Sequence, residues 1–139
     1  MSKLTLEITS FSYKKGIPKD DSEHGGGFVF DCRAIHNPGR YEQYKEVTGK
    51  DTPVIKFFEQ EPSMAQFLEH VFPLIEMSVK TYLEREFTHL QVNFGCTGGQ
   101  HRSVYAAEQL KTHIEKLFGG RLDIYIQHIE QEQLNVPRL

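Results

Sequence analysis

The chain has 139 residues, of which 38% are hydrophobic, so it can bury one apolar core and is predicted to form a single domain over residues 1–139. A formal net charge of −3 disfavours a general nucleic-acid binder, whose affinity comes mainly from Lys and Arg. Two cysteines, no apolar run of about 18 residues and no secretory signal argue against a disulfide framework, a closed zinc site, a membrane span and export. We therefore expect a cytoplasmic protein without metal, cofactor or membrane contact.

The first half of the chain alternates between strand-like and irregular segments. Apolar residues at every second position predict a strand over residues 3–11, KLTLEITSF. Residues 14–27, rich in Gly and Pro, predict a solvated and mobile crossover. Residues 28–35, FVFDCRAI, predict a second strand, and the turn residues of 36–51 predict a long ordered loop.

Two helices are predicted after this loop. Thr52, as an N-cap followed by proline, predicts a short helix that ends near Pro62. Ser63 and Gln66 form a capping-box pattern. Apolar residues at helical spacing then predict the longest helix, which continues to about Arg85.

The second half predicts a strand, a helix and a strand in sequence. Residues 89–95 alternate as a strand, residues 102–118 carry a helical apolar stripe, and the two glycines 119–120 end that helix. Residues 122–126 predict the last strand, before a polar tail around 130–133. This order predicts a right-handed parallel unit, and hence a three-layer α/β fold with a mainly parallel sheet of about four strands.

The loop GCTGGQHRS, residues 95–103, has the chemistry of an anion site. Its two glycines let backbone N–H groups converge, and the helix that follows adds a positive dipole. Thr97, Arg102 and Ser103 add hydroxyl and guanidinium donors. Ligands of open α/β sheets bind beyond the carboxyl ends of the strands, where this loop is predicted to lie. The alternative is a glycine-rich turn that merely connects a strand to a helix.

The same loop permits a catalytic interpretation. Cys96 and Ser103 delimit C-x5-R-S, the spacing of protein tyrosine phosphatases, which makes Cys96 a candidate nucleophile activated by Arg102. Asp31 or Asp51 is then the candidate general acid. Without a lysine before its serine, the loop is not a Walker A motif.

Other charged residues allow two interpretations each. Asp31 and Arg33 leave the same face near a strand end, as ligand contacts or as a solvated ion pair. His101 is either a ligand contact or an ordinary helix-start residue. Lys14 and Lys15 are either a solvated run or contacts to RNA or phosphate.

Four segments together resemble one family. In chain order, FSYKKGIP, FVFDCRAIHNP, VTGKD and GCTGGQHRSVYAAEQL resemble motifs of the C-terminal domain of the RapZ (YvcJ-like) family. The resemblance implies a fold similar to part of the phosphofructokinase-type kinases, amino-sugar-phosphate sensing, and RNA binding as an RNase adaptor. Family members usually carry an N-terminal P-loop kinase-like domain. This chain lacks that domain, so we expect a free-standing C-terminal domain to which nucleotide hydrolysis does not transfer.

The resemblance also assigns residues to sites. Two sets match ligand-site positions of the family: Thr97, Gly98, Gly99, His101, Arg102 and Ser103 in the loop, and Asp31, Arg33 and Asn37 outside it. Lys14 and Lys15 match a basic patch linked with RNA. The leading hypothesis is a noncatalytic domain that binds a sugar phosphate or a nucleotide. A cysteine-dependent phosphatase or phosphotransferase and an RNA or RNase adaptor are the alternatives, and the ligand and oligomeric state stay open.

Overall fold

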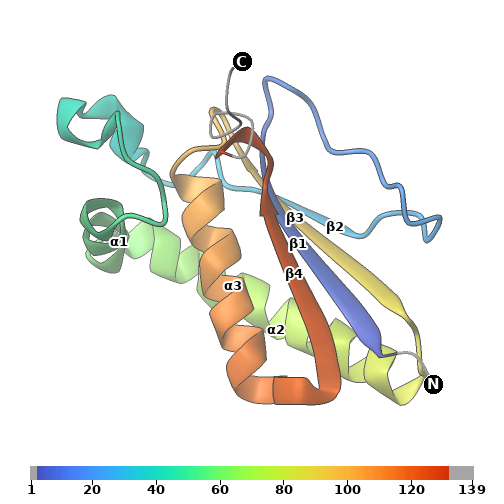
Figure 1. The fold of residues 1–139 in the computed structure, drawn as a ribbon. Helices are drawn as coiled ribbons and strands as arrows, with labels where there is room; N and C mark the ends of the chain where they lie inside the picture. The colour runs from blue at the N-terminus through green and yellow to red at the C-terminus, as the bar shows by residue number, and fades with distance from the viewer. Residues whose placement is uncertain (1–2, 132–139) are drawn as a thin grey trace.

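The computed structural model describes residues 3–131, which form one four-stranded sheet packed against helices (Figure 1). The strands are β1 (Leu4–Ser12), β2 (Phe28–Asp31), β3 (His89–Cys96) and β4 (Leu122–His128). The α-helices are α1 (Thr52–Glu59), α2 (Pro62–Glu84) and α3 (Arg102–Phe118), with short 3-10 helices at Pro38–Arg40, Glu42–Tyr44 and Gly119–Arg121. All neighbouring strands are parallel, in the order β2-β3-β1-β4. The predicted α/β class and four-stranded parallel sheet are confirmed.

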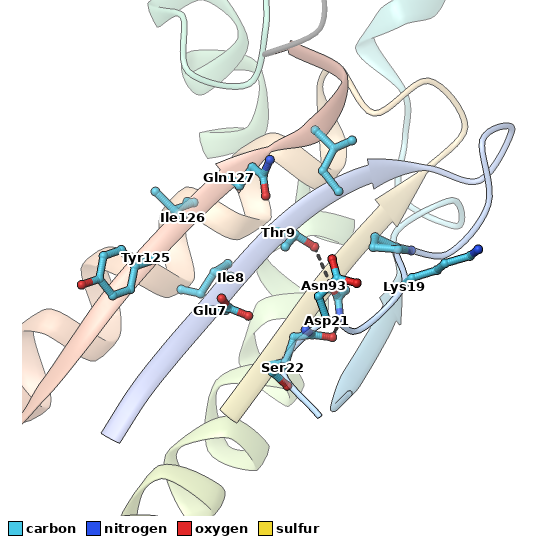
Figure 2. A pocket seen from close by; sticks show the side chains of 13 residues that line it. Glu7, Ile8, Thr9, Lys19, Asp21, Ser22, Asn93, Tyr125, Ile126 and Gln127 are labelled. Atoms are coloured by element: carbon cyan, nitrogen blue, oxygen red, sulfur yellow. Dashed lines mark hydrogen bonds between the residues drawn. The ribbon is translucent and has the colours of Figure 1, made fainter. Parts of the chain in front are cut away.

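The strand order explains which segments cover which face of the sheet. The crossovers from β2 to β3 and from β3 to β4 run in the same direction across the sheet, whereas that from β1 to β2 runs in the opposite direction. Right-handed crossovers therefore require α2 and α3 on one face and residues 13–27 on the other. The helices do contact each other, and residues 18–22 lie over the opposite face (Figure 2). The three layers are thus helices, sheet and an irregular segment.

The core lies between the sheet and the helix layer. Leu6 and Ile8 of β1 and Val92 of β3 are fully buried on the face that packs against α2 and α3. The alternation predicted for these strands is confirmed, because their intervening residues are polar and line the other face. The helices contribute a matching set of buried residues: Val71, Ile75, Val79, Leu110 and Ile114.

Two predicted helix starts are wrong by one or two residues. The N-cap of α1 is Asp51, not Thr52, because the Asp51 carbonyl already accepts the N–H of Ile55 at 3.0 Å, which makes Thr52 the first helical residue and Pro53 the second. Similarly, α2 begins at Pro62, and the N-cap side chain of Glu61 accepts the N–H of Ser63 at 2.8 Å, so Ser63 is not the cap of a capping box. The bounds of α3 match the prediction. The part of the predicted polar tail beyond residue 131 lies outside the described residues.

No helix within residues 3–131 combines the length and the apolar character needed to cross a membrane.

The central strand gives a test of the core. Ile8→Ala removes a fully buried side chain between two neighbouring strands, so it should lower the free energy of unfolding by about 2–5 kcal/mol. Urea denaturation followed by circular dichroism measures this change. The control is Ile17→Ala, at a side chain that is 57% exposed, which should leave stability unchanged. Equal losses in both variants would contradict the packing described here.

Candidate functional site

The fold brings four strand ends to one edge of the sheet, and β1 and β3 diverge there. Ser12 pairs with Cys96 at the ends of these adjacent strands. From there, β1 continues into the segment that covers one face, whereas β3 continues into α3 on the other. Ligands of open α/β sheets bind at such a divergence, because no segment crosses the strand ends to close it. The residues that follow Ser12 and Cys96 are therefore the place to look for a site.

The glycine loop is pressed against the end of β1. Gly99 has a φ of +66°, and a Cβ atom there would lie 3.0 Å from the backbone nitrogen of Ser12, so a side chain is excluded on both grounds. Ser12 Oγ donates to the carbonyl of Thr97 at 2.5 Å. At the start of α3 the N-cap His101 makes no side-chain capping hydrogen bond, so first-turn N–H groups and the helix dipole remain available to an anion.

The predicted long loop, residues 36–51, forms the facing wall. Gln100 Nε2 donates to the carbonyls of Lys45 and Val47, both at 2.8 Å. His101 Nε2 donates to the carbonyl of Tyr44 at 2.7 Å. Burial lowers the pKa of His101, so its ring is neutral near pH 7 and serves as a hydrogen-bond donor to this wall.

Arg102 is the most constrained polar side chain of the site. It is only 5% exposed, and its Nη1 donates to the carbonyls of Arg33 at 2.8 Å and Ile35 at 3.0 Å. Its Nη2 reaches Thr97 Oγ1 at 3.3 Å. Its Nε is buried and has no hydrogen-bond partner within the described residues. A buried guanidinium with a spare donor is suited to an oxyanion.

These elements enclose a cavity of about 270 Å³. Its lining combines three cationic side chains with neutral polar groups: Lys14, Asn37, Gly39, Lys45, Cys96, Thr97, Gly98, Gln100, His101 and Arg102. No carboxylate is among these lining residues, although the chain as a whole has a net charge of −3. Residues 3–131 contain no group of three or more His, Cys, Asp and Glu that could hold a metal ion. The lining itself therefore carries positive charge, and one of its cations, Lys45, is ion-paired at 3.1 Å with the exposed Glu42 outside the lining.

The structure brings together some of the predicted site residues and not others. Lys14, Asn37, Cys96, Thr97, Gly98, His101 and Arg102 line the cavity. The lining does not include Lys15, Asp31, Arg33, Gly99 and Ser103. Lys45 and Gln100 line it without having been predicted. The loop lengths gave one clue to them, because long loops at strand ends often carry function.

Asp31 and Arg33 form an ion pair beside the cavity. Arg33 Nε and Nη2 hold the Asp31 carboxylate in a two-pronged contact, at 2.9 and 2.7 Å, and both side chains are about half exposed. The backbone N–H of Arg33 also donates to Asp31 Oδ1 at 2.8 Å, and this turn ends β2 at Asp31 and not at residue 35 as predicted. The Arg33 guanidinium lies 3.8 Å from the centre of the Tyr13 ring. A ligand contact by this pair stays a prediction.

The catalytic alternative needs a reactive thiol and an acid. Cys96 lines the cavity but is 2% exposed, and its Sγ lies 3.1 Å from Ser103 Oγ. Hydrogen bonds from Arg33 lower the pKa of Asp31, so this carboxyl is ionised at neutral pH and cannot donate a proton. Asp51 accepts the N–H of Thr48 at 2.6 Å and does not line the cavity. The arrangement favours holding an anion over transferring one, and the reactivity of Cys96 stays a prediction.

A second, larger hollow of about 590 Å³ lies on the face of the sheet opposite the helices (Figure 2). Its polar floor is already hydrogen-bonded, since Thr9 donates to Asn93 at 2.5 Å and Asn93 donates to Gln91 at 3.1 Å. Its charged lining residues are Glu7, Lys19 and Asp21. Two carboxylates against one amine make this hollow a poor match for an anion.

Fold and cavity together define a parallel α/β domain with a positively charged cavity where two adjacent strands diverge. Domains of this class place ligands beyond the carboxyl ends of their strands. The chain belongs to the RapZ C-terminal domain family, whose model matches residues 4–132. The family resemblance seen in the sequence is thereby confirmed.

Similar proteins carry one shared name. Proteins named "Nucleotide-binding protein" from Nitrosomonas eutropha and from an Acidovorax species are 43% and 37% identical to this chain, over 112 and 129 residues. The matches cover 81% and 93% of this chain but only 37% and 42% of those relatives. A similarly named protein of Cereibacter sphaeroides is 39% identical over 109 residues, which are 78% of this chain and 34% of that protein. The chain thus spans well under half of the length of these relatives.

The contact between the loop of residues 36–51 and the start of α3 gives the second prediction. A Cβ atom at Gly49 would lie 2.5 Å from both the His101 carbonyl oxygen and the Tyr105 nitrogen. Gly49→Ala should therefore lower the free energy of unfolding by about 1–3 kcal/mol, because backbone on both sides must move. The matched control is Gly98→Ala in the facing loop, where a Cβ meets no atom within 4 Å and stability should be retained. Urea denaturation distinguishes the two, and equal stability of both variants would contradict the described contact.

Proposed function

We propose that this domain binds a phosphorylated metabolite, either a sugar phosphate or a nucleotide, and holds its phosphate in the cavity at residues 96–103 without transforming it. The observation that carries the proposal is Arg102, which lines the cavity together with Lys14 and Lys45 and whose buried Nε has no hydrogen-bond partner within the described residues. A phosphate has enough acceptor oxygens to satisfy this donor and the lysines together.

The energetics favour an anion at this place. A buried donor without a partner costs about 1–3 kcal/mol, and a bound phosphate oxygen relieves that cost. The start of α3 adds N–H groups and a positive dipole at the same point. The cavity of about 270 Å³ lies just below the usual range for ligand sites, which suits a phosphate with a small attached group.

The comparisons support two ligand classes. The relatives are named nucleotide-binding proteins, which favours a nucleotide. The family resemblance implies an amino-sugar phosphate. Both ligand classes carry a phosphate group, so the phosphate contacts are the common part of the proposal.

The RNA or RNase adaptor role remains a prediction. Lys14 lines the cavity, and Lys15 beside it is exposed. Gel shifts with structured RNA at physiological salt test the RNA contact, and absence of binding there would exclude that contact.

Calorimetric titration tests the proposed function. Wild-type protein and Arg102→Gln are titrated with glucosamine 6-phosphate, adenosine monophosphate and inorganic phosphate. Losing charge-assisted hydrogen bonds worth about 1.5–3 kcal/mol should weaken binding of at least one phosphorylated ligand roughly 10- to 150-fold. Absence of binding by all three ligands, or equal affinity of both proteins, would refute the proposal.

Two further variants separate binding from folding. Arg102 also holds the carbonyls of residues 33 and 35, so urea denaturation must accompany the titration. Lys45→Ala removes a cavity cation on an exposed side chain and should weaken binding while stability is retained. Its control is Lys116→Ala on an exposed position of α3 outside the cavity lining, which should change neither.

A further inference from the structure

The cations that line the phosphate cavity differ in depth. Arg102 is only 5% exposed, whereas Lys14 and Lys45 are exposed. The guanidinium of Arg102 is fixed, because its terminal nitrogens are hydrogen-bonded to residues 33, 35 and 97. The lysines carry their ammonium groups on flexible four-carbon stems, so these charges can move toward a ligand. The cavity therefore combines one buried, fixed donor with two movable charges at its mouth.

Hydrogen bonds hold the backbones of both lysines beside the glycine loop. The N–H of Lys14 donates at 3.1 Å to Ser12 Oγ, which itself donates to the Thr97 carbonyl. From the facing wall, the carbonyl of Lys45 accepts Gln100 Nε2 at 2.8 Å. The two ammonium groups therefore belong to one cavity mouth although they come from different segments.

Few counter-charges compete for these ammonium groups. Lys14 has no ion-pair partner within residues 3–131. Lys45 pairs with Glu42 at 3.1 Å, but the Glu42 side chain is 89% exposed, and an exposed ion pair of this kind contributes little to stability. The Asp31 carboxylate beside the cavity is already held by Arg33. A ligand can therefore engage both lysines without breaking a strong interaction.

One phosphate group does not balance the charge of the lining. At neutral pH a phosphate monoester carries a charge of about −1.5 to −2, against three cationic side chains. A phosphate at the buried Nε of Arg102 and the first N–H groups of α3 would have its oxygens engaged by these donors. The exposed lysines are then left for a second anionic group. In a diphosphate, one bridging oxygen joins the two phosphates, so the second can extend from the buried donor toward the mouth.

We propose that this cavity takes a diphosphate group, with one phosphate at Arg102 and the start of α3 and the other between Lys14 and Lys45. The inference rests on the proposed function and narrows its ligand class from any phosphate to a diphosphate, free or esterified. An esterified diphosphate directs its organic group out of the mouth, where the exposed lysines lie. The two lysines are thus the residues that distinguish a diphosphate from a monophosphate.

Two pairs of ligands test the proposal by calorimetric titration without divalent cations: orthophosphate with pyrophosphate, and adenosine monophosphate with adenosine diphosphate. The wild-type protein should prefer the diphosphate roughly 2- to 30-fold, because two exposed ammonium groups contact the second phosphate. The double variant Lys14→Gln/Lys45→Gln should bring this ratio near one. Arg102→Gln should weaken both members of a pair by a similar factor, because both place a phosphate at Nε. A preference in the inorganic pair alone identifies free pyrophosphate as the ligand, and a preference in both pairs includes its esters.

The matched control is Lys80→Gln/Lys116→Gln, at exposed positions of α2 and α3 outside the cavity lining. It removes the same charge as the cavity variant and should keep the ratio. Circular dichroism verifies that each variant is folded. Ratios near one for both pairs in the wild type, or a preference that the Lys14/Lys45 variant retains, would overturn the inference, whereas monophosphate binding that depends on Arg102 would still support the proposed function. Absence of binding by all four ligands would refute the proposed function and this inference with it.

Discussion

The hydrogen bonds of Arg102 hold the site together. Through Nη1 this side chain binds two carbonyls of the segment that follows β2, and through Nη2 it reaches the residue that follows β3. It belongs to the first turn of α3, so one guanidinium joins two strand ends and a helix start. These bonds use both terminal nitrogens of the guanidinium, whereas its Nε lies buried without a partner in the described residues. The same constraint thus builds the cavity and supplies its spare donor.

Charge placement matters more here than total charge. The chain has a net charge of −3, yet the cavity at the strand ends is lined by three cations and no carboxylate, while the hollow on the other face has two carboxylates and one amine. Nearby, Arg33 keeps Asp31 ionised, which removes it as a proton donor. A site with cations and no available acid is suited to binding a phosphate group. The contrast in charge distinguishes the cavity at the strand ends from the hollow on the face of the sheet.

The sequence predicted most of the fold because each strand and helix has a clear period. The helical stripe of residues 102–118 and the alternation of β1 and β3 were sufficient to find these elements. The helix starts at Asp51 and Glu61 were misplaced because serine and threonine are the more usual capping residues, whereas here acidic residues one and two positions earlier are the N-caps. Lys45 and Gln100 were missed for another reason. The Gln100 side chain donates to the backbone carbonyl of Lys45, which lies 55 residues earlier in the chain, and no local sequence pattern encodes such a contact.

The central claim is that Arg102 Nε donates to a phosphate oxygen. The most direct measurement is the NMR signal of the arginine Nε–H group, recorded while a phosphorylated ligand is added to ¹⁵N-labelled protein. We predict that the Arg102 signal shifts downfield and saturates together with binding, while that of Arg121, which lies outside this cavity, stays in place. An Arg102 signal that does not move while the ligand binds would contradict the claim.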